Sequence, residues 1–317
     1  MRRSESYLTV PLLTLRAEDQ QALMTKAFVC AATLLVMTDQ ATGDSPREFA
    51  SSSTVRKYFL EDWAIAKGFT MVPKEAAFSV YKEMFLLSET QVTGAVVEAG
   101  VWRGGSSMLM AMAHKRVVHS ADRHEHRSFW LYDTFDGLPA PGVEDGAKVN
   151  DIFKALQAFK NGTANEKQRR IVTERGAKGW INMTVGKWDF GPLDEVQRNM
   201  HRVMGVHHAT NVHYVVGKVE DTLRMDAPAN ALPERICLLR LDTDFYSSTA
   251  VELSVLWPRL QPGGLLLVDD YFAYGGARKA VDDWLQAHNW TKYASGLHST
   301  KAYPWHVRKI GAFVGPH

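Results

Sequence analysis

The stretch GAVVEAGVWRGGSSMLMAMAHK, residues 94–115, contains the pattern that decides the fold. It begins with a short apolar run that is interrupted by one acid, Glu98, as in a strand of a covered sheet. Three glycines follow within six residues, and residues 106–115 then have the composition of a helix, with Ser106 or Ser107 expected as its N-cap. A strand that leads through a glycine turn into a helix is the first unit of a doubly wound α/β sheet.

The same alternation of strand, turn and helix continues along the chain. Further apolar runs predict strands at 128–135, 211–217, 235–242, 263–270 and 311–315, with helices at 193–204 and 277–288 among them. Near-continuous apolar strands that alternate with helices indicate a parallel sheet covered on both faces. We therefore predict a Rossmann-like α/β fold with a doubly wound, mostly parallel sheet.

The first part of the chain has a different pattern. Helices are expected at 16–37 and 72–87, separated by a loop over 38–57 that is rich in helix-breaking residues. We predict that residues 1–66 form a helical extension, which covers the active face or contacts a second subunit, and that residues 67–317 form the sheet domain. Within that domain, residues 142–180 are polar and are expected to form an excursion over the active face.

Composition excludes several classes of function. The 317 residues carry a formal net charge of +2 and no long basic run, so a nucleic acid is not expected as a partner. Two cysteines without a CxxC pair fit a reducing compartment. The apolar run AFVCAATLLVM is shorter than the about 20 residues that cross a bilayer. These features predict a cytoplasmic protein without a membrane span.

The glycine turn lies where the ligands of a doubly wound sheet bind. Its spacing is not GxGxxG, so a dinucleotide is not favoured, and a tight turn without a ligand is the alternative. An acid before the turn and a second acid after the next strand would suit the ammonium and the ribose of S-adenosylmethionine (SAM). The candidate SAM-binding residues are Glu98, Gly100, Gly104, Ser106, Asp133, Gly217 and Asp221.

Carboxylates also follow the last two apolar strands of the parallel pattern. Asp242 ends one strand, and Asp269 and Asp270 end the next. Because the carboxyl ends of parallel strands meet at one edge, these three acids should form a site for Mg²⁺, Mn²⁺ or Ca²⁺. The alternative is that Asp242 caps a helix and that Asp269 or Asp270 makes only a surface contact. Asp244 could face a substrate as a general base, or it could form an Asx turn before the next helix.

Five motifs in register resemble the macrocin O-methyltransferase (TylF-like) family over about residues 67–284. They are VVEAGVWRGGSSMLMA, LYDTFDGLP, VVGKVEDTL, LLRLDTDFYSSTAVEL and LQPGGLLLVDDY. The resemblance implies a class I methyltransferase fold and a SAM- and Mg²⁺-dependent sugar O-methyltransferase. It also implies that Asp242, Asp269 and Asp270 hold the metal ion and that Asp244 is the general base. The first ~60 residues and the segment 142–180 have no counterpart that the motifs place.

The predicted function is methylation of a sugar hydroxyl, within a vicinal diol, on a glycosylated natural product. A homo-oligomer, dimeric or larger, is expected. Two alternatives stay open at this point. One is a catechol-type enzyme that methylates a phenol with the same cation, and the other is a SAM-binding protein without catalysis.

Overall fold

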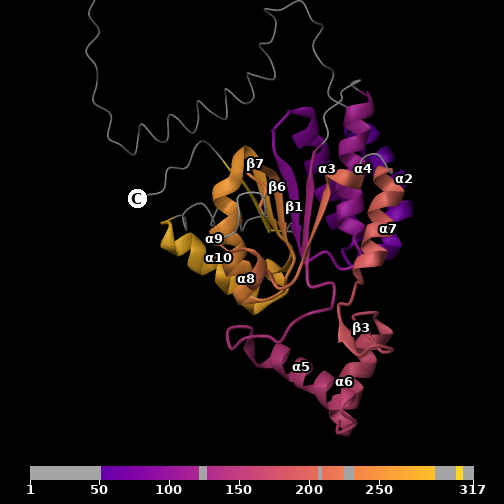
Figure 1. The fold of residues 1–317 in the computed structure, drawn as a ribbon, viewed down its shortest axis with the longest axis vertical. Helices are drawn as coiled ribbons and strands as arrows, with labels where there is room; N and C mark the ends of the chain where they lie inside the picture. The colour runs from indigo at the N-terminus through magenta and orange to yellow at the C-terminus, as the bar shows by residue number, and fades with distance from the viewer. Residues whose placement is uncertain (1–50, 121–126, 206–208, 225–231, 290–304, 310–317) are drawn as a thin grey trace, which may run out of the picture. The chain divides into compact units, whose positions relative to one another are not determined.

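The computed structural model describes residues 51–120, 127–205, 209–224, 232–289 and 305–309, which Figure 1 shows in colour. The chain divides into two compact units, Met1–Ala50 and Ser51–His317, and all described residues belong to the second unit. The helix predicted at 16–37 and the strand predicted at 311–315 lie outside the described residues.

Helices and strands alternate along the described chain. The helices are α2 (Ser52–Ala66), α3 (Lys74–Glu89), α4 (Gly105–Ser120), α5 (Gly146–Lys160), α6 (Glu166–Ala177), α7 (Leu193–Met204), α8 (Val219–Thr222), α9 (Tyr246–Leu256) and α10 (Gly275–Ala287), with 3-10 turns at η1 (Lys67–Phe69), η2 (Ala209–Asn211), η4 (Trp257–Arg259) and η5 (Asp269–Phe272). The strands are β1 (Ala95–Ala99), β2 (Phe129–Asp133), β3 (Ile181–Asn182), β4 (Lys187–Trp188), β5 (Val212–Val216), β6 (Ile236–Leu241), β7 (Leu260–Val268) and β8 (Trp305–Arg308).

Six strands form one sheet in the order β5-β2-β1-β6-β7-β8. The pairs β1–β2, β2–β5, β1–β6 and β6–β7 are parallel, and β8 runs antiparallel to β7. The chain moves outward from β1 through β2 to β5 and then returns to the other side of β1 with β6. The order therefore reverses between β1 and β6, which is the switch point where ligands bind in such sheets.

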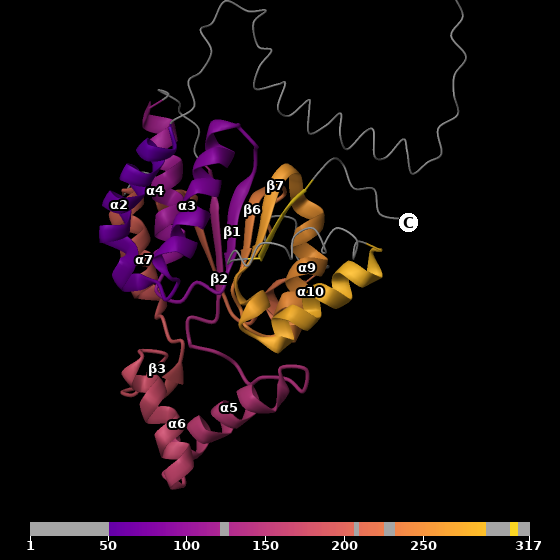
Figure 2. The ribbon, with the colours of Figure 1, turned by 180° about the vertical axis from the view of Figure 1, so that it is seen from behind.

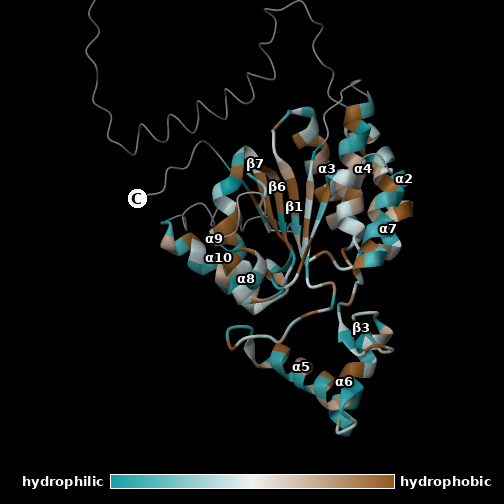
Figure 3. Ribbon diagram, viewed as in Figure 1, coloured by the Kyte–Doolittle hydropathy of each residue, from teal (hydrophilic) through white to brown (hydrophobic). Residues whose placement is uncertain are grey.

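Helices cover both faces of the sheet (Figures 1 and 2). Helices α2, α3, α4 and α7 lie on one side, and α8, α9 and α10 lie on the other. All six residues of β6 are buried, as expected for a strand covered on both faces. Figure 3 shows the central strands as the apolar layer of the molecule. The predicted doubly wound, mostly parallel sheet is confirmed.

Two predicted element boundaries are wrong. The loop expected over 38–57 ends earlier, because α2 begins at Ser52 with the Ser51 hydroxyl accepting a hydrogen bond from the Thr54 amide at 3.3 Å. Helix α4 begins at Gly105, so Ser106 lies in its first turn and is not the N-cap. The division predicted at residue 66 stays a prediction, and α2 packs against α3 and α4 within the second unit.

The polar segment 142–180 contains two helices, α5 and α6 (Figure 1). Its buried apolar residues Val149, Ile152, Ala155, Leu156 and Val172 form a small core together with Ile181 of β3 and Trp188 of β4, which follow the segment. Phe245, from the loop after β6, is a member of the same cluster. The segment is thereby anchored beside the end of β6 and is not a loose loop.

Within the described part of the chain, no helix combines the length and the apolar character that a membrane span requires.

Candidate active site

A pocket opens at the carboxyl edge of the sheet and gathers residues that are far apart in the sequence. Nine of the predicted site residues line it, namely Glu98, Gly100, Ser106, Asp133, Gly217, Asp242, Asp244, Asp269 and Asp270. Two of the predicted cofactor residues do not. Gly104 faces the Val196 side chain, and Asp221 is exposed on the short helix α8. Their predicted contact with a cofactor has no support in the pocket lining.

The glycine turn is shaped by the neighbouring strand. Gly100 has a φ of +82°, and a Cβ there would overlap the backbone carbonyl of Asp242. The Asp242 amide donates to the Ala99 carbonyl oxygen at 2.8 Å, so the ends of β1 and β6 are tied together. Only glycine permits both the left-handed backbone and this close approach.

Asp133 holds the same turn from β2. Its Oδ2 accepts hydrogen bonds from the amides of Val101 at 2.7 Å and Trp102 at 3.0 Å, and its Oδ1 accepts from the Phe135 amide at 2.7 Å. Burial raises the pKa of Asp133, and these hydrogen bonds oppose that rise. Trp102 and Phe135 both have positive φ angles, of 48° and 50°, which are costly for bulky residues. The carboxylate thus shapes the pocket wall in addition to lining it.

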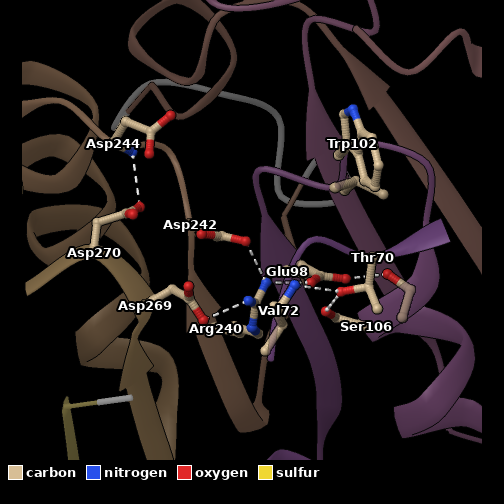
Figure 4. Close-up of polar contacts among 12 residues, drawn as sticks. Thr70, Val72, Glu98, Trp102, Ser106, Arg240, Asp242, Asp244, Asp269 and Asp270 are labelled. Carbon is tan, nitrogen blue, oxygen red and sulfur yellow. Dashed lines mark hydrogen bonds and ion pairs between the residues drawn. The ribbon is translucent and has the colours of Figure 1, made fainter. Parts of the chain in front are cut away.

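Three acids come together at the ends of β6 and β7. Asp242, Asp269 and Asp270 each offer a carboxylate oxygen, and these oxygens all lie within 4.8 Å of one another (Figure 4). Burial and the charge of Asp242 raise the pKa of Asp269 to about 7, against the lowering effect of Arg240. Hard oxygen donors at this spacing fit Mg²⁺, Mn²⁺ or Ca²⁺.

Arg240 belongs to the acid cluster but is not among the site residues that the sequence predicts. Its side chain is 1% exposed, and it donates to Glu98 Oε1 at 2.6 Å, to Asp242 Oδ2 at 2.7 Å and to Asp269 Oδ1 at 2.6 Å. It is the positive charge that a cluster of buried carboxylates requires. The signal was present, since Arg240 is the one charged residue in the apolar run ICLLRL and precedes Asp242 by two positions, on the same face of the strand.

Glu98 is enclosed by protein partners. Besides Arg240, its carboxylate accepts a hydrogen bond from the Ser107 hydroxyl, and the residue is 1% exposed. Burial raises the pKa of Glu98 to about 7, although Arg240 and Ser107 lower it. The predicted contact between Glu98 and the ammonium of SAM stays a prediction.

Asp244 lies apart from the Arg240 cluster (Figure 4). Its backbone has a φ of 67°, and its amide donates to Asp270 Oδ2 at 3.1 Å. Helix α9 begins only after Phe245 and has no side-chain cap, so Asp244 does not cap it. Burial raises the pKa of Asp244 well above its usual range, and the charges of Asp189 and Asp242 add to this rise.

Asp189 is a second residue that the sequence did not indicate. It follows β4, has a φ of 47° and lines the pocket with the acids of the sheet edge. Burial, followed by the charges of Asp242 and Asp133, raises the pKa of Asp189 to about 8. The surrounding sequence, KWDFGP, has no pattern that distinguishes this acid from a surface residue.

The fold and the pocket at its switch point define a Rossmann-like class I methyltransferase fold. A solved structure of the O-methyltransferase NovP has this fold, with a TM-score of 0.52 at 20% identity over 92% of this chain and 99% of that one. Residues 6–168 and 189–305 match the model of the macrocin O-methyltransferase (TylF) family, so the chain belongs to that family. The family match begins earlier than predicted and includes most of the first 60 residues and residues 142–168. Residues 169–188, which include the last part of the predicted excursion (169–180), lie outside the match.

Two curated relatives come from Streptomyces. The 8-demethyl-8-(2,3-dimethoxy-alpha-L-rhamnosyl)-tetracenomycin-C 4'-O-methyltransferase of Streptomyces olivaceus is 33% identical over 61% of this chain. The demethyldecarbamoylnovobiocin O-methyltransferase of Streptomyces niveus is 32% identical over 61% of this chain. The alignment spans 58% of the length of each relative, which is less than two thirds.

Proposed function

We propose that this protein is a SAM-dependent, divalent-cation-dependent O-methyltransferase that acts on a sugar hydroxyl within a vicinal diol of a glycosylated natural product. The observation that carries the proposal is one pocket in which the glycine turn, the three clustered acids and Asp244 all meet. The relatives support the acceptor class, since the name of one specifies a rhamnosyl-bearing substrate. A SAM-binding protein without catalysis would need neither the clustered acids nor a separate base.

Two groups from outside the chain are needed. SAM, beside Gly100, Asp133 and Gly217, would supply the methyl group, and a cation held by Asp242 and the other two clustered acids would supply Lewis acidity at an acceptor hydroxyl. Asp244 would accept the proton of that hydroxyl, because an alcohol is a weak nucleophile while it keeps its proton. The negative charges around Asp244 favour its protonated form, and a nearby cation would favour the ionised form that a base requires.

The remaining residues of the pocket would position the acceptor and exclude water. Trp180 and Trp188 line the pocket from the segment after α6, and Trp180 is 38% exposed. An aromatic face at the mouth of the pocket would pack against the apolar face of a sugar or against its aglycone. Holding the hydroxyl in line with the methyl donor supplies much of the rate of such a transfer.

The test is a screen of glycosides with labelled SAM. Rhamnosides that carry a vicinal diol are compared with the same glycosides deoxygenated at one of the two positions, with Mg²⁺ and with EDTA. The proposal expects labelling of the diols only, and only with Mg²⁺. Labelling of catechols but of no glycoside would favour the phenol-methylating alternative, and equal labelling in EDTA would remove the cation from the mechanism.

The predicted homo-oligomer also stays a proposal. Light scattering of the full chain and of a chain without the first ~60 residues would test both the oligomer and the role of the extension. If each of the two proteins has the mass of its own monomer, the proposed homo-oligomer is contradicted.

A further inference from the structure

The charge balance of the pocket depends on one buried side chain. Of the residues that line the pocket, Arg240 and Lys218 are the cationic ones, and Lys218 is exposed. Arg240 lies on the central strand β6, is 1% exposed and donates to acids of β1 and of the ends of β6 and β7 (Figure 4). A planar guanidinium presents its donors in a fixed fork, so it fixes the direction of the carboxylates that it contacts.

Strand register sets this arrangement. Arg240 is the register partner of Glu98 on β1 and of Leu267 on β7. Asp242 directly follows β6, two residues after Arg240 and on the same face, and Asp269 begins η5 directly after β7, two residues after Leu267. Each contact of Arg240 is consequently built on a strand or at its end, not on a flexible loop.

The three clustered acids divide into two kinds by the group that donates a hydrogen bond to each of them. Arg240 donates to Asp242 and Asp269, whereas Asp270 accepts from the Asp244 amide. A carboxylate has about four acceptor positions on its two oxygens, so a bond to Arg240 still leaves capacity for a cation. Without Arg240, the like charges of Asp242, which is half-buried, and of Asp269, which is buried, would repel each other.

We infer that Arg240 is a positioning residue for the cation site: it holds Asp242 and Asp269 in their ligating arrangement, and Glu98 in turn fixes Arg240 from β1. This inference rests on the proposed function, because it assumes that the three acids bind a divalent cation. It assigns the Glu98 carboxylate a structural part in the cation site.

The test uses Arg240→Met, which removes the charge, and Arg240→Lys, which keeps a charge but loses the fork. Mg²⁺ is titrated calorimetrically into the full chain saturated with S-adenosylhomocysteine, and the affinity for S-adenosylhomocysteine is measured separately. Loss of a residue that supports metal ligands commonly weakens binding about 10–100-fold, and we expect a loss of this size for Arg240→Met. Arg240→Lys should lose less, and the affinity for S-adenosylhomocysteine should change far less than that for Mg²⁺.

Arg116→Met is the matched control. Arg116 also binds two acids, Glu61 at 2.9 Å and Asp62 at 2.7 Å, but it does so on α4 away from the pocket. This variant should lose stability without a change in Mg²⁺ affinity. If Arg240→Met does not fold, Arg240→Lys decides the question.

Three outcomes are separable. Weaker Mg²⁺ binding confined to the Arg240 variants supports the inference. Equal or tighter Mg²⁺ binding by these variants overturns it and leaves the proposed function standing, because Arg240 would then only compete with the cation. Absence of Mg²⁺ binding by the wild-type protein overturns the inference and the proposed cation dependence together.

Discussion

Two regions of one pocket are built in different ways. The acid edge, defined as Asp242, Asp244, Asp269 and Asp270, follows two central parallel strands. Asp269 and Asp270 are buried, as is Arg240, whereas Asp242 and Asp244 are half-buried. The insert, defined as residues 169–188, lies outside the family match and exposes Met183 and Val185 to solvent. The difference suggests a division of labour in which the sheet edge carries the chemistry and the insert selects the acceptor.

The largest effect is expected at Asp244. Asp244→Asn is nearly isosteric but cannot take a proton, so kcat should fall about 10²–10⁴-fold, the usual contribution of a general base. Added Mg²⁺ should not restore the rate. The measurement is kcat against Mg²⁺ concentration, with Asp270→Asn as the comparison, because loss of a charged ligand should be partly overcome by more Mg²⁺. If Mg²⁺ restores the rate of Asp244→Asn, Asp244 is a metal ligand and not a separate general base.

Asp133→Ala should affect the methyl donor and not the cation. Loss of hydrogen bonds to a charged acceptor costs about 1.5–3 kcal/mol, and here the turn at Val101 and Trp102 also loses its support. Calorimetry should show weaker binding of S-adenosylhomocysteine and an Mg²⁺ affinity close to wild type. Asp136→Ala is the control, since this nearby acid pairs with Lys187 and does not line the pocket. Unchanged affinity for S-adenosylhomocysteine would count against Asp133 as a contributor to that site.

The insert should act on the acceptor alone. Trp180→Ala should raise the KM for a glycoside acceptor about tenfold, or about 1.4 kcal/mol, while kcat changes little. Met183→Ala is the matched control, because Met183 lies in the same insert, is 41% exposed and does not line the pocket. A fall in kcat with an unchanged KM would place Trp180 in the chemistry and contradict the division.

A smaller effect concerns a buried acid just outside the pocket. Glu252 is fully buried on α9, and its carboxylate accepts from the Thr243 hydroxyl at 3.0 Å. Burial raises the pKa of Glu252 to about 8, while an unfolded chain ionises near about 4.3. The folded state therefore keeps the Glu252 proton up to a higher pH than the unfolded chain does. The free energy of unfolding falls as pH rises between these two pKa values.

Glu252→Gln should remove that contribution. In denaturant titrations, the free energy of unfolding of the variant should exceed that of the wild type at pH 8 and should approach it near pH 4. Equal pH dependence in the two proteins would mean that folding does not raise the pKa of Glu252.

The sequence predicted the acid edge more fully than the pocket wall opposite to it. Apolar runs that end in carboxylates were sufficient to place Asp242, Asp269 and Asp270 at one edge, because parallel register leaves few alternatives. The partner of these acids, Arg240, lies within an apolar run that predicts a strand but not the contacts of its one charged side chain. Asp189 could not be found, since its position depends on how the segment before α7 returns to the sheet.

The helices of the excursion were missed for a different reason. Val149, Ile152 and Leu156 have helical spacing within α5, but the polar residues around them dominated the composition. Their burial depends on a partner, Phe245, that lies about 90 residues farther along the chain. A local pattern could indicate the helix but not the surface against which it packs.

The central claim is that the acid edge binds one divalent cation and keeps Asp244 as a separate base. Electron paramagnetic resonance of added Mn²⁺ counts bound ions without any need for an acceptor. The account predicts one tightly bound Mn²⁺ per chain in the wild type and in Asp244→Asn, and markedly weaker binding in Asp270→Asn. No bound Mn²⁺ in the wild type, or loss of binding in Asp244→Asn but not in Asp270→Asn, would contradict it.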